Sequence, residues 1–257
     1  MINIASYIDH TILKPVTTYI EIKKICEEAL EYGFAAVCVP PPLVQRALES
    51  LESPSAGAAK LQGDGKTGSR RDEAGDVKVA TVIGFPFGYS VLNAKLAETE
   101  QALADGADEL DVVINLVALK NGDWGYLTRE MAAITERVHN RGKIVKVIIE
   151  SGILQDNEII RCCEIYAALG VDFLKTSTGY AEKGATLGAV QLMRRHLPAG
   201  IRIKASGGIR DYAFARQLIE AGADRLGCSA SVTIVAGQPS DKTAAQSPAQ
   251  PSGKTDY

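Results

Sequence analysis

The sequence predicts an α/β protein that folds as one (β/α)8 barrel, or TIM barrel, over residues 1–236. The chain has 257 residues and 46% of them are hydrophobic, which suits one large core and the usual length of such barrels. Short β-branched runs alternate with longer amphipathic stretches, as in repeated βα units. A doubly wound open sheet is the alternative, but the G-x-G-x-x-G turn that usually follows its first strand is missing.

Eight runs have the length and the β-branched composition of strands. They span residues 7–10, 35–40, 78–85, 109–115, 144–150, 172–177, 201–206 and 225–228. Eight strands with helical stretches between them favour a closed parallel barrel.

The stretches between these runs carry helical signals. IEIKKICEEALEYG repeats apolar residues at helical spacing and ends at Gly33, and LNAKLAETEQALADG does so and ends at Gly106. DYAFARQLIEAGAD opens on Asp211, an N-cap candidate, and ends at Gly222.

Two segments do not fit the alternation. Residues 53–76 are rich in Gly, Ser, Ala and charged residues and show no apolar period, so we expect a flexible insertion there. Residues 237–257 have a similar composition and are expected to form a flexible tail.

Charge and composition exclude several functional classes. The net charge of -3 offers no basic face for nucleic acid, and an aromatic content of 6% argues against base stacking. The N-terminal residues lack the basic and apolar regions of a signal peptide, and no apolar run approaches the roughly 20 residues that span a bilayer. We therefore expect a cytoplasmic protein with no membrane partner.

Cysteine and histidine do not indicate a disulfide framework or a metal site. The five cysteines form no C-x-x-C pair, and we expect them to be reduced thiols packed as small hydrophobic residues. His10, His139 and His196 are scattered along the chain, whereas a zinc-dependent enzyme would need clustered imidazoles. No metal and no cofactor is therefore predicted.

Four predicted strands each carry one charge opposite an apolar face. Side chains alternate between the faces of a strand, so Asp111, Lys146, Lys175 and Lys204 lie opposite residues that suit the helix-facing side of a barrel. Because the interior of a barrel is packed, we expect these charges to lie together near the C-terminal mouth of the strands. Taken singly, a strand lysine is usually a solvated one, but four inward charges on consecutive strands indicate a functional cluster.

Three lysines against one carboxylate would make a strongly positive pocket, in which crowding lowers the pKa of at least one lysine. A lysine of lowered pKa is a nucleophile toward carbonyl carbon and forms a Schiff base. The iminium then accepts electrons when a neighbouring carbon–carbon bond breaks, and a nearby carboxylate can move protons. The cluster thus favours carbon–carbon lyase chemistry.

Glycine-rich turns after the last strands indicate a phosphate site. SGG at 206–208 and GCSAS at 227–231 follow the seventh and eighth strands, where barrel enzymes often bind phosphate through backbone N–H groups. Thr178 and Gly179, in STG at 177–179, could add hydroxyl and backbone donors.

Six motifs, in order and at comparable spacing, resemble the deoxyribose-phosphate aldolase family: IDHTILKP, VATVIGFPFG, ELDVVIN, VKVIIESG, FLKTSTG and IKASGGIR. The resemblance extends from about residue 7 to about residue 231. It implies a (β/α)8 class I aldolase that reversibly cleaves 2-deoxy-D-ribose 5-phosphate into D-glyceraldehyde 3-phosphate and acetaldehyde.

The resemblance also implies roles for individual residues. Lys175 matches the Schiff-base lysine, Lys204 the second lysine that perturbs it, and Asp111 the acid/base carboxylate. Lys146 matches a lysine hydrogen-bonded within the site. The positions that match the phosphate-binding loops of the family are Gly207, Gly208 and Ser229.

The chain departs from the family pattern in three places. Residues 53–76 are longer than the expected connection, and Tyr180 stands where some members carry a lysine near the phosphate. The chain ends in Tyr257, and some members use a C-terminal tyrosine to assist proton abstraction.

Two other functions stay open at the level of sequence. One is a phosphosugar isomerase or epimerase on the same barrel, and the other is a non-catalytic binder of sugar phosphates. We expect phosphosugar and aldehyde ligands of low molecular mass, and a homodimer is a candidate assembly.

Overall fold

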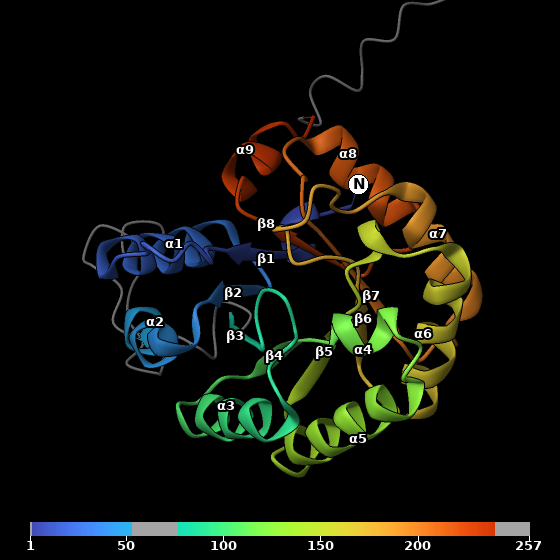
Figure 1. The fold of residues 1–257 in the computed structure, drawn as a ribbon. Coiled ribbons are helices and arrows are strands. Elements are labelled where there is room, and N and C mark those ends of the chain that lie inside the picture. The colour runs from blue at the N-terminus through green and yellow to red at the C-terminus, as the bar shows by residue number, and fades with distance from the viewer. Residues whose placement is uncertain (1, 53–76, 240–257) are drawn as a thin grey trace, which may run out of the picture.

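The computed structural model describes residues 2–52 and 77–239, which form a closed parallel barrel inside a ring of helices (Figure 1). The (β/α)8 fold predicted from the sequence is confirmed. The predicted insertion at 53–76, the predicted tail from residue 240 onward and Tyr257 lie outside the described residues.

The strands follow one another around the barrel in chain order. They are β1 (Ile8–Thr11), β2 (Ala36–Val39), β3 (Lys78–Ile83), β4 (Glu109–Val113), β5 (Ile144–Ile148), β6 (Phe173–Lys175), β7 (Arg202–Ser206) and β8 (Arg225–Cys228). All neighbouring strands are parallel, and β1 pairs with both β2 and β8, so the sheet closes without a free edge. Each strand was predicted at its place, with ends that differ by two residues at most.

Helices follow every strand and cover the outside of the barrel. They are α1 (Tyr19–Tyr32), α2 (Val44–Glu52), α3 (Leu92–Ala104), α4 (Leu116–Lys120), α5 (Trp124–Asn140), α6 (Asp156–Ala168), α7 (Leu187–His196), α8 (Tyr212–Glu220) and α9 (Ser231–Ala236). Short 3-10 turns are η1 (Ile4–Tyr7), η2 (Pro41–Leu43) and η5 (Ser151–Ile153). None of the helices in the described ranges is long and apolar enough to cross a bilayer.

The helix boundaries follow from the capping residues that the sequence shows. Thr18 and Glu21 form a capping box at the start of α1, and Gly33 ends this helix in the left-handed region at φ 68°. The side chain of Asp211 accepts a hydrogen bond from the Phe214 N–H at the start of α8, as predicted.

The main hydrophobic core lies between the outer face of the barrel and the helices. In β4, for example, Leu110 and Val112 are fully buried on this side, as the alternation predicted. A second, small apolar cluster lies on the other face of β2 and β3 and consists of Cys38, Ala80 and Val82. All five cysteines of the chain are buried.

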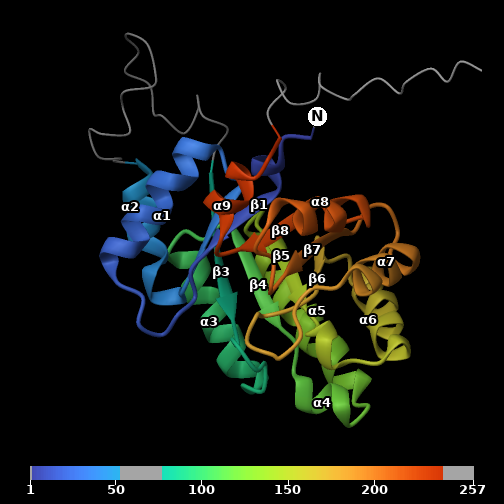
Figure 2. The same ribbon diagram turned by 90° about the horizontal axis from the view of Figure 1, so that it is seen from above.

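The two ends of the barrel are distinct. Figure 2 shows the N-terminus on one side of the molecule and α4 on the opposite side. The segment η1 contributes buried Ile4 and Ala5 near the start of β1. The loops that follow the strands gather at the other end, where ligands bind in barrels of this type.

Candidate active site

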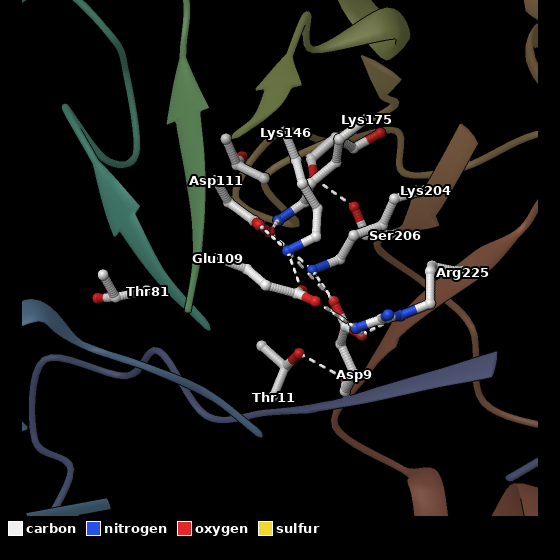
Figure 3. A network of polar contacts seen from close by, with 12 residues as sticks. Asp9, Thr11, Thr81, Glu109, Asp111, Lys146, Lys175, Lys204, Ser206 and Arg225 are labelled. Atoms are coloured by element: carbon white, nitrogen blue, oxygen red, sulfur yellow. Dashed lines mark hydrogen bonds and ion pairs between the residues drawn. The ribbon is translucent and has the colours of Figure 1, made fainter. Parts of the chain in front are cut away.

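The strand register brings the four predicted charges into the barrel interior. Asp111 pairs in register with Lys146 across β4 and β5, and Lys175 pairs with Lys204 across β6 and β7. All four side chains are buried, with at most 2% of any of these residues exposed. They converge from four consecutive strands, as Figure 3 shows.

Asp111 is the centre of this group. Its Oδ1 accepts a hydrogen bond from Lys146 Nζ at 2.8 Å, while its Oδ2 accepts from Lys175 Nζ and from Lys204 Nζ, each at 2.7 Å. A carboxylate has about four lone-pair directions, so three donors can be accommodated at once. The three contacts fix the orientation of this side chain.

The charge composition predicted for the pocket was wrong. Asp9 and Glu109 are also buried here, and Arg225 donates to both of them (Figure 3). Lys204 Nζ lies 2.5 Å from Asp9 Oδ2, and Lys146 Nζ lies 2.5 Å from Glu109 Oε2. The cluster therefore contains three carboxylates and four basic groups, and is close to balanced rather than strongly positive.

The alternation of side chains along the strands also places Asp9, Glu109 and Arg225, which were not predicted, on the inner face of the barrel. Glu109 precedes Asp111 by two residues, so both lie on one face of β4. Asp9 alternates with Ile8 in β1, and Arg225 alternates with Leu226 in β8. Ile8 and Leu226 belong to the outer core, which places Asp9 and Arg225 on the inner face.

The three lysines differ in their pKa values. Burial lowers the pKa of Lys175, and the nearby Lys204 ammonium lowers it further against the opposing pull of Asp111. Burial also disfavours the charged form of Lys204, but the carboxylates of Asp111 and Asp9 outweigh it and raise the pKa. The pKa of Lys146 is raised in the same way, by Asp111 and Glu109. Lys175 is thus the lysine of this group that most readily becomes a neutral amine.

Lys175 also has the position of a reactive group. It is the last residue of β6, whereas Asp111, Lys146 and Lys204 occupy the middle of their strands. A cavity of about 530 Å³ opens at this end of the barrel, and Lys175 lines it. Of the three described lysines in the cluster, Lys175 alone lines the cavity; Lys146, predicted among the substrate contacts, does not.

The glycine-rich turns lie where the sequence predicted a phosphate site. Five residues predicted to contact substrate or phosphate line the cavity together with Lys175: Thr178, Gly179, Gly207, Gly208 and Ser229. Gly207 has a φ of 88°, and a Cβ added there would lie 3.0 Å from the Cα of Gly184. The close approach of these two backbones leaves no room for a side chain at this edge of the cavity.

The comparisons with known proteins agree with this geometry. Residues 3–233 match the family model described as DeoC/LacD family aldolase. The chain belongs to this family. It is 46% identical to the deoxyribose-phosphate aldolase of Thermococcus gammatolerans, over 91% of this chain and 96% of that protein.

Further relatives carry the same name. The deoxyribose-phosphate aldolase of Caldanaerobacter subterraneus is 45% identical, over 91% of this chain and 93% of that protein. The solved structure of the tetrameric deoxyribose phosphate aldolase from Aeropyrum pernix superposes with a TM-score of 0.76 and 31% identity, covering 91% of this chain and 89% of that one.

This DeoC/LacD family aldolase has an aromatic contact at the cavity rim, made by Tyr180. The Tyr180 hydroxyl donates a hydrogen bond to the Leu13 carbonyl at 2.8 Å, and its ring lies edge-on to Phe85 at 5.3 Å between centroids. Tyr180 therefore connects the loops that follow β1, β3 and β6. Lys14 and Arg210 also line the cavity and are cations available to a bound anion.

No group of three or more His, Cys, Asp or Glu side chains within residues 2–52 and 77–239 has an arrangement that could hold a metal ion.

Proposed function

We propose that this chain is a deoxyribose-phosphate aldolase that cleaves 2-deoxy-D-ribose 5-phosphate reversibly into D-glyceraldehyde 3-phosphate and acetaldehyde. The observation that carries the proposal is the amine of Lys175, which lines the cavity, has a lowered pKa and lies 2.7 Å from Asp111. Relatives that are 45% and 46% identical bear this name, which supports the choice of substrate.

The charge balance of the cluster supports Lys175 as the nucleophile. Lys146 contacts three carboxylates within 3.8 Å and Lys204 contacts two, whereas Lys175 contacts Asp111 alone among the described carboxylates. Buried charges are tolerated when they are paired. With Lys175 neutral, three carboxylates face three cations, so Lys175 loses its proton at the least cost.

The first half of the reaction forms the imine. The neutral Lys175 Nζ adds to the C1 carbonyl of the open-chain sugar to give a carbinolamine, which takes up one proton and loses water to give an iminium ion. This cation stays beside the buried carboxylate of Asp111, which stabilises the positive charge.

The second half breaks the carbon–carbon bond. Asp111 and Lys204, acting through a water molecule, remove the proton of the C3 hydroxyl. The C3 oxygen becomes the carbonyl oxygen of glyceraldehyde 3-phosphate, and the electrons of the C2–C3 bond move into the iminium to form an enamine. Protonation of the enamine at its carbon and hydrolysis of the resulting imine release acetaldehyde and restore Lys175.

The remaining site residues hold the substrate and the carboxylate. Backbone N–H groups at Gly179, Gly207 and Gly208, with the Ser229 hydroxyl, bind the phosphate group. Lys146 has no contact with substrate in this scheme and acts through Asp111, which it holds at 2.8 Å.

Reductive trapping tests the proposal. Incubation with acetaldehyde and borohydride should add one ethyl group to the protein, and peptide mass spectrometry should place it on Lys175. A Lys175→Met variant is the control and should stay unmodified. An unmodified Lys175 in an active wild-type enzyme would favour an isomerase or epimerase, which needs no imine, and the absence of turnover would favour a sugar-phosphate binder.

The assembly and the location are part of the same proposal. The tetramer of the Aeropyrum pernix relative supports self-association, and we infer at least a homodimer for this chain. Light scattering of the purified protein tests this inference, and cell fractionation tests the cytoplasmic location predicted from the sequence.

A further inference from the structure

Six charged side chains inside the barrel form a closed ring, which we call the charge ring (Figure 3). Each member contacts two members of opposite charge, and the six ion pairs that join them are 2.5–3.1 Å long. The order around the ring is Asp9, Lys204, Asp111, Lys146, Glu109 and Arg225, which contacts Asp9 again. Acids and bases therefore alternate, and the ring has three charges of each sign.

Lys175 is joined to the charge ring through Asp111. Its Nζ contacts Asp111 Oδ2, the oxygen that Lys204 Nζ also contacts. A ring member that becomes neutral loses its attraction to two opposite charges, whereas Lys175 loses its contact with Asp111. Because the ring is neutral without Lys175, removal of any one ring charge changes the electrostatic potential at this amine.

The members of the charge ring keep their charges at neutral pH. The guanidinium group of Arg225 stays protonated in proteins. Burial raises the pKa of Asp9, but Lys204 and Arg225 outweigh it and hold this pKa well below its usual range. The lysines lower the pKa of Asp111 in the same way, and the carboxylates raise the pKa of Lys146 and of Lys204.

Other titratable groups face Lys175 from outside the charge ring. Cys38 on β2 acts on it, but burial raises the pKa of this thiol, which is therefore uncharged at neutral pH. Glu150, in the loop after β5, also interacts electrostatically with Lys175. The loops after β1, β6 and β7 contribute Lys14, Tyr180 and Arg210 to the same cavity. All these groups stay in place when a ring charge is removed, so a comparison of ring variants reports the ring alone.

Arg225 and Glu109 are the ring members without a role in the proposed mechanism. Arg225 lies opposite Asp111 in the order of the ring, and Glu109 is its neighbour. Neither of these two described residues lines the cavity, so neither touches a ligand bound there.

We propose that Arg225 and Glu109 are positioning residues for imine formation, each supplying one charge that keeps the charge ring neutral, so that together they set the pH above which Lys175 reacts with aldehydes. The inference rests on the proposed function, in which Lys175 is the nucleophile.

The two residues act on Lys175 in opposite directions. Contacts of 2.7, 2.8 and 2.5 Å lead from Lys175 through Asp111 and Lys146 to Glu109. At roughly 10 Å and an effective dielectric constant of ~20, one unit charge shifts a pKa by about 1 pH unit. Glu109→Gln leaves the ring with a net positive charge and should move the rising limb of the pH profile about 1 pH unit lower. Arg225→Met leaves a net negative charge and should move it about 1 pH unit higher.

The test measures the pH dependence of two reactions that need the neutral amine of Lys175. One is cleavage of 2-deoxy-D-ribose 5-phosphate, followed as kcat/KM. The other is reductive methylation of Lys175 by formaldehyde and cyanoborohydride, followed by peptide mass spectrometry, with exposed lysines of the same digest as the internal reference. The methylation reports the state of the amine whether or not the sugar phosphate is a substrate.

Three controls separate the charge of the ring from its shape. Arg225→Lys keeps the charge and should keep the rising limb close to that of the wild type. Combining Arg225→Met with Glu109→Gln makes the ring neutral again and should return the limb toward the wild-type position. Arg216→Met and Glu220→Gln each remove one charge of an exposed ion pair in α8 and should leave the limb in place.

Opposite shifts that cancel in the double variant support the inference. If both single variants lower kcat/KM while the limb stays in place, or if both move it in the same direction, the two residues are structural only and the inference is overturned. If Arg225→Met does not fold, Glu109→Gln, which keeps the shape of its side chain, decides alone: an unmoved limb overturns the inference.

The two reactions distinguish this inference from the proposed function. Opposite shifts in the methylation of Lys175, without cleavage of the sugar phosphate, would uphold the role of the charge ring and refute the proposed function. Efficient cleavage with a limb that stays in place in every ring variant would overturn the inference and leave the proposed function intact.

Discussion

Replacing Lys204 with leucine tests the electrostatic basis of the proposed mechanism. Lys204 Nζ and Lys175 Nζ each lie 2.7 Å from the same oxygen of Asp111, so the two amines are no more than twice that distance apart. Two unit charges about 5.4 Å apart repel by about 3 kcal/mol at an effective dielectric constant of ~20. The Lys204→Leu substitution removes this repulsion, and Asp111 then contacts only Lys175 and Lys146 among the three lysines. The pKa of Lys175 therefore rises, and its neutral fraction falls by roughly 100-fold.

The assay is the pH dependence of kcat/KM for cleavage of 2-deoxy-D-ribose 5-phosphate. In Lys204→Leu, activity near neutral pH should fall by about 100-fold or more, and the rising limb of the profile should move to higher pH. Lys120→Leu removes a lysine from a partly exposed ion pair with Glu158 and should change neither quantity. A Lys204→Leu enzyme that folds, loses activity and keeps the rising limb of the wild type would refute the coupling between the two lysines.

Three further predictions concern stability. Burial raises the pKa of Asp111, but the three lysines outweigh it and hold this pKa well below 3.8. The contribution of Asp111 to the free energy of unfolding is therefore present above about pH 3.8 and is lost as the pH falls. Denaturant titrations should show that the stability of Asp111→Asn depends less on acid pH than that of the wild type. Lys95→Met leaves the buried Glu130 without its cationic partner and should lower the free energy of unfolding by about 3–5 kcal/mol, whereas the double variant with Glu130→Leu should recover most of the loss. Gly88→Ala places a Cβ 1.8 Å from a backbone oxygen and should cost roughly 1–3 kcal/mol more than Gly122→Ala, which has a similar φ and open space, as thermal melting can measure.

The barrel and the four charges assigned to its interior could be predicted because both depend on the alternation of side chains between the two faces of a strand. Each strand places an apolar residue outward and another residue inward, so Lys175 and Lys204 were assigned to the interior from the sequence alone. The prediction of strand ends was less accurate at the mouth. The run that includes β6 was expected over 172–177, but the ladder ends at Lys175. Beyond this point the Thr176 carbonyl accepts from the Ser151 N–H and the Thr176 hydroxyl donates to the Ser206 carbonyl, tertiary contacts that local composition does not contain.

The balance of charge could not be predicted from the residues that were considered. Asp9, Glu109 and Arg225 carry the same alternation signal, but their association depends on which strands lie across the barrel from one another. Arg225 reaches Glu109 over a sequence separation of 116 residues, and only the closed strand order makes them neighbours.

The asymmetry of the barrel interior explains why only one of three buried lysines is suited to form an imine. The charged cluster draws its residues from β1 and β4–β8 (Figure 3). The inner face of β2 and β3 is apolar at Cys38, Ala80 and Val82. The apolar side offers Lys175 no carboxylate, while the charged side supplies Asp111 and Lys204. An amine with one carboxylate and one ammonium beside it gains little from keeping its own proton, and it is this amine that lines the cavity.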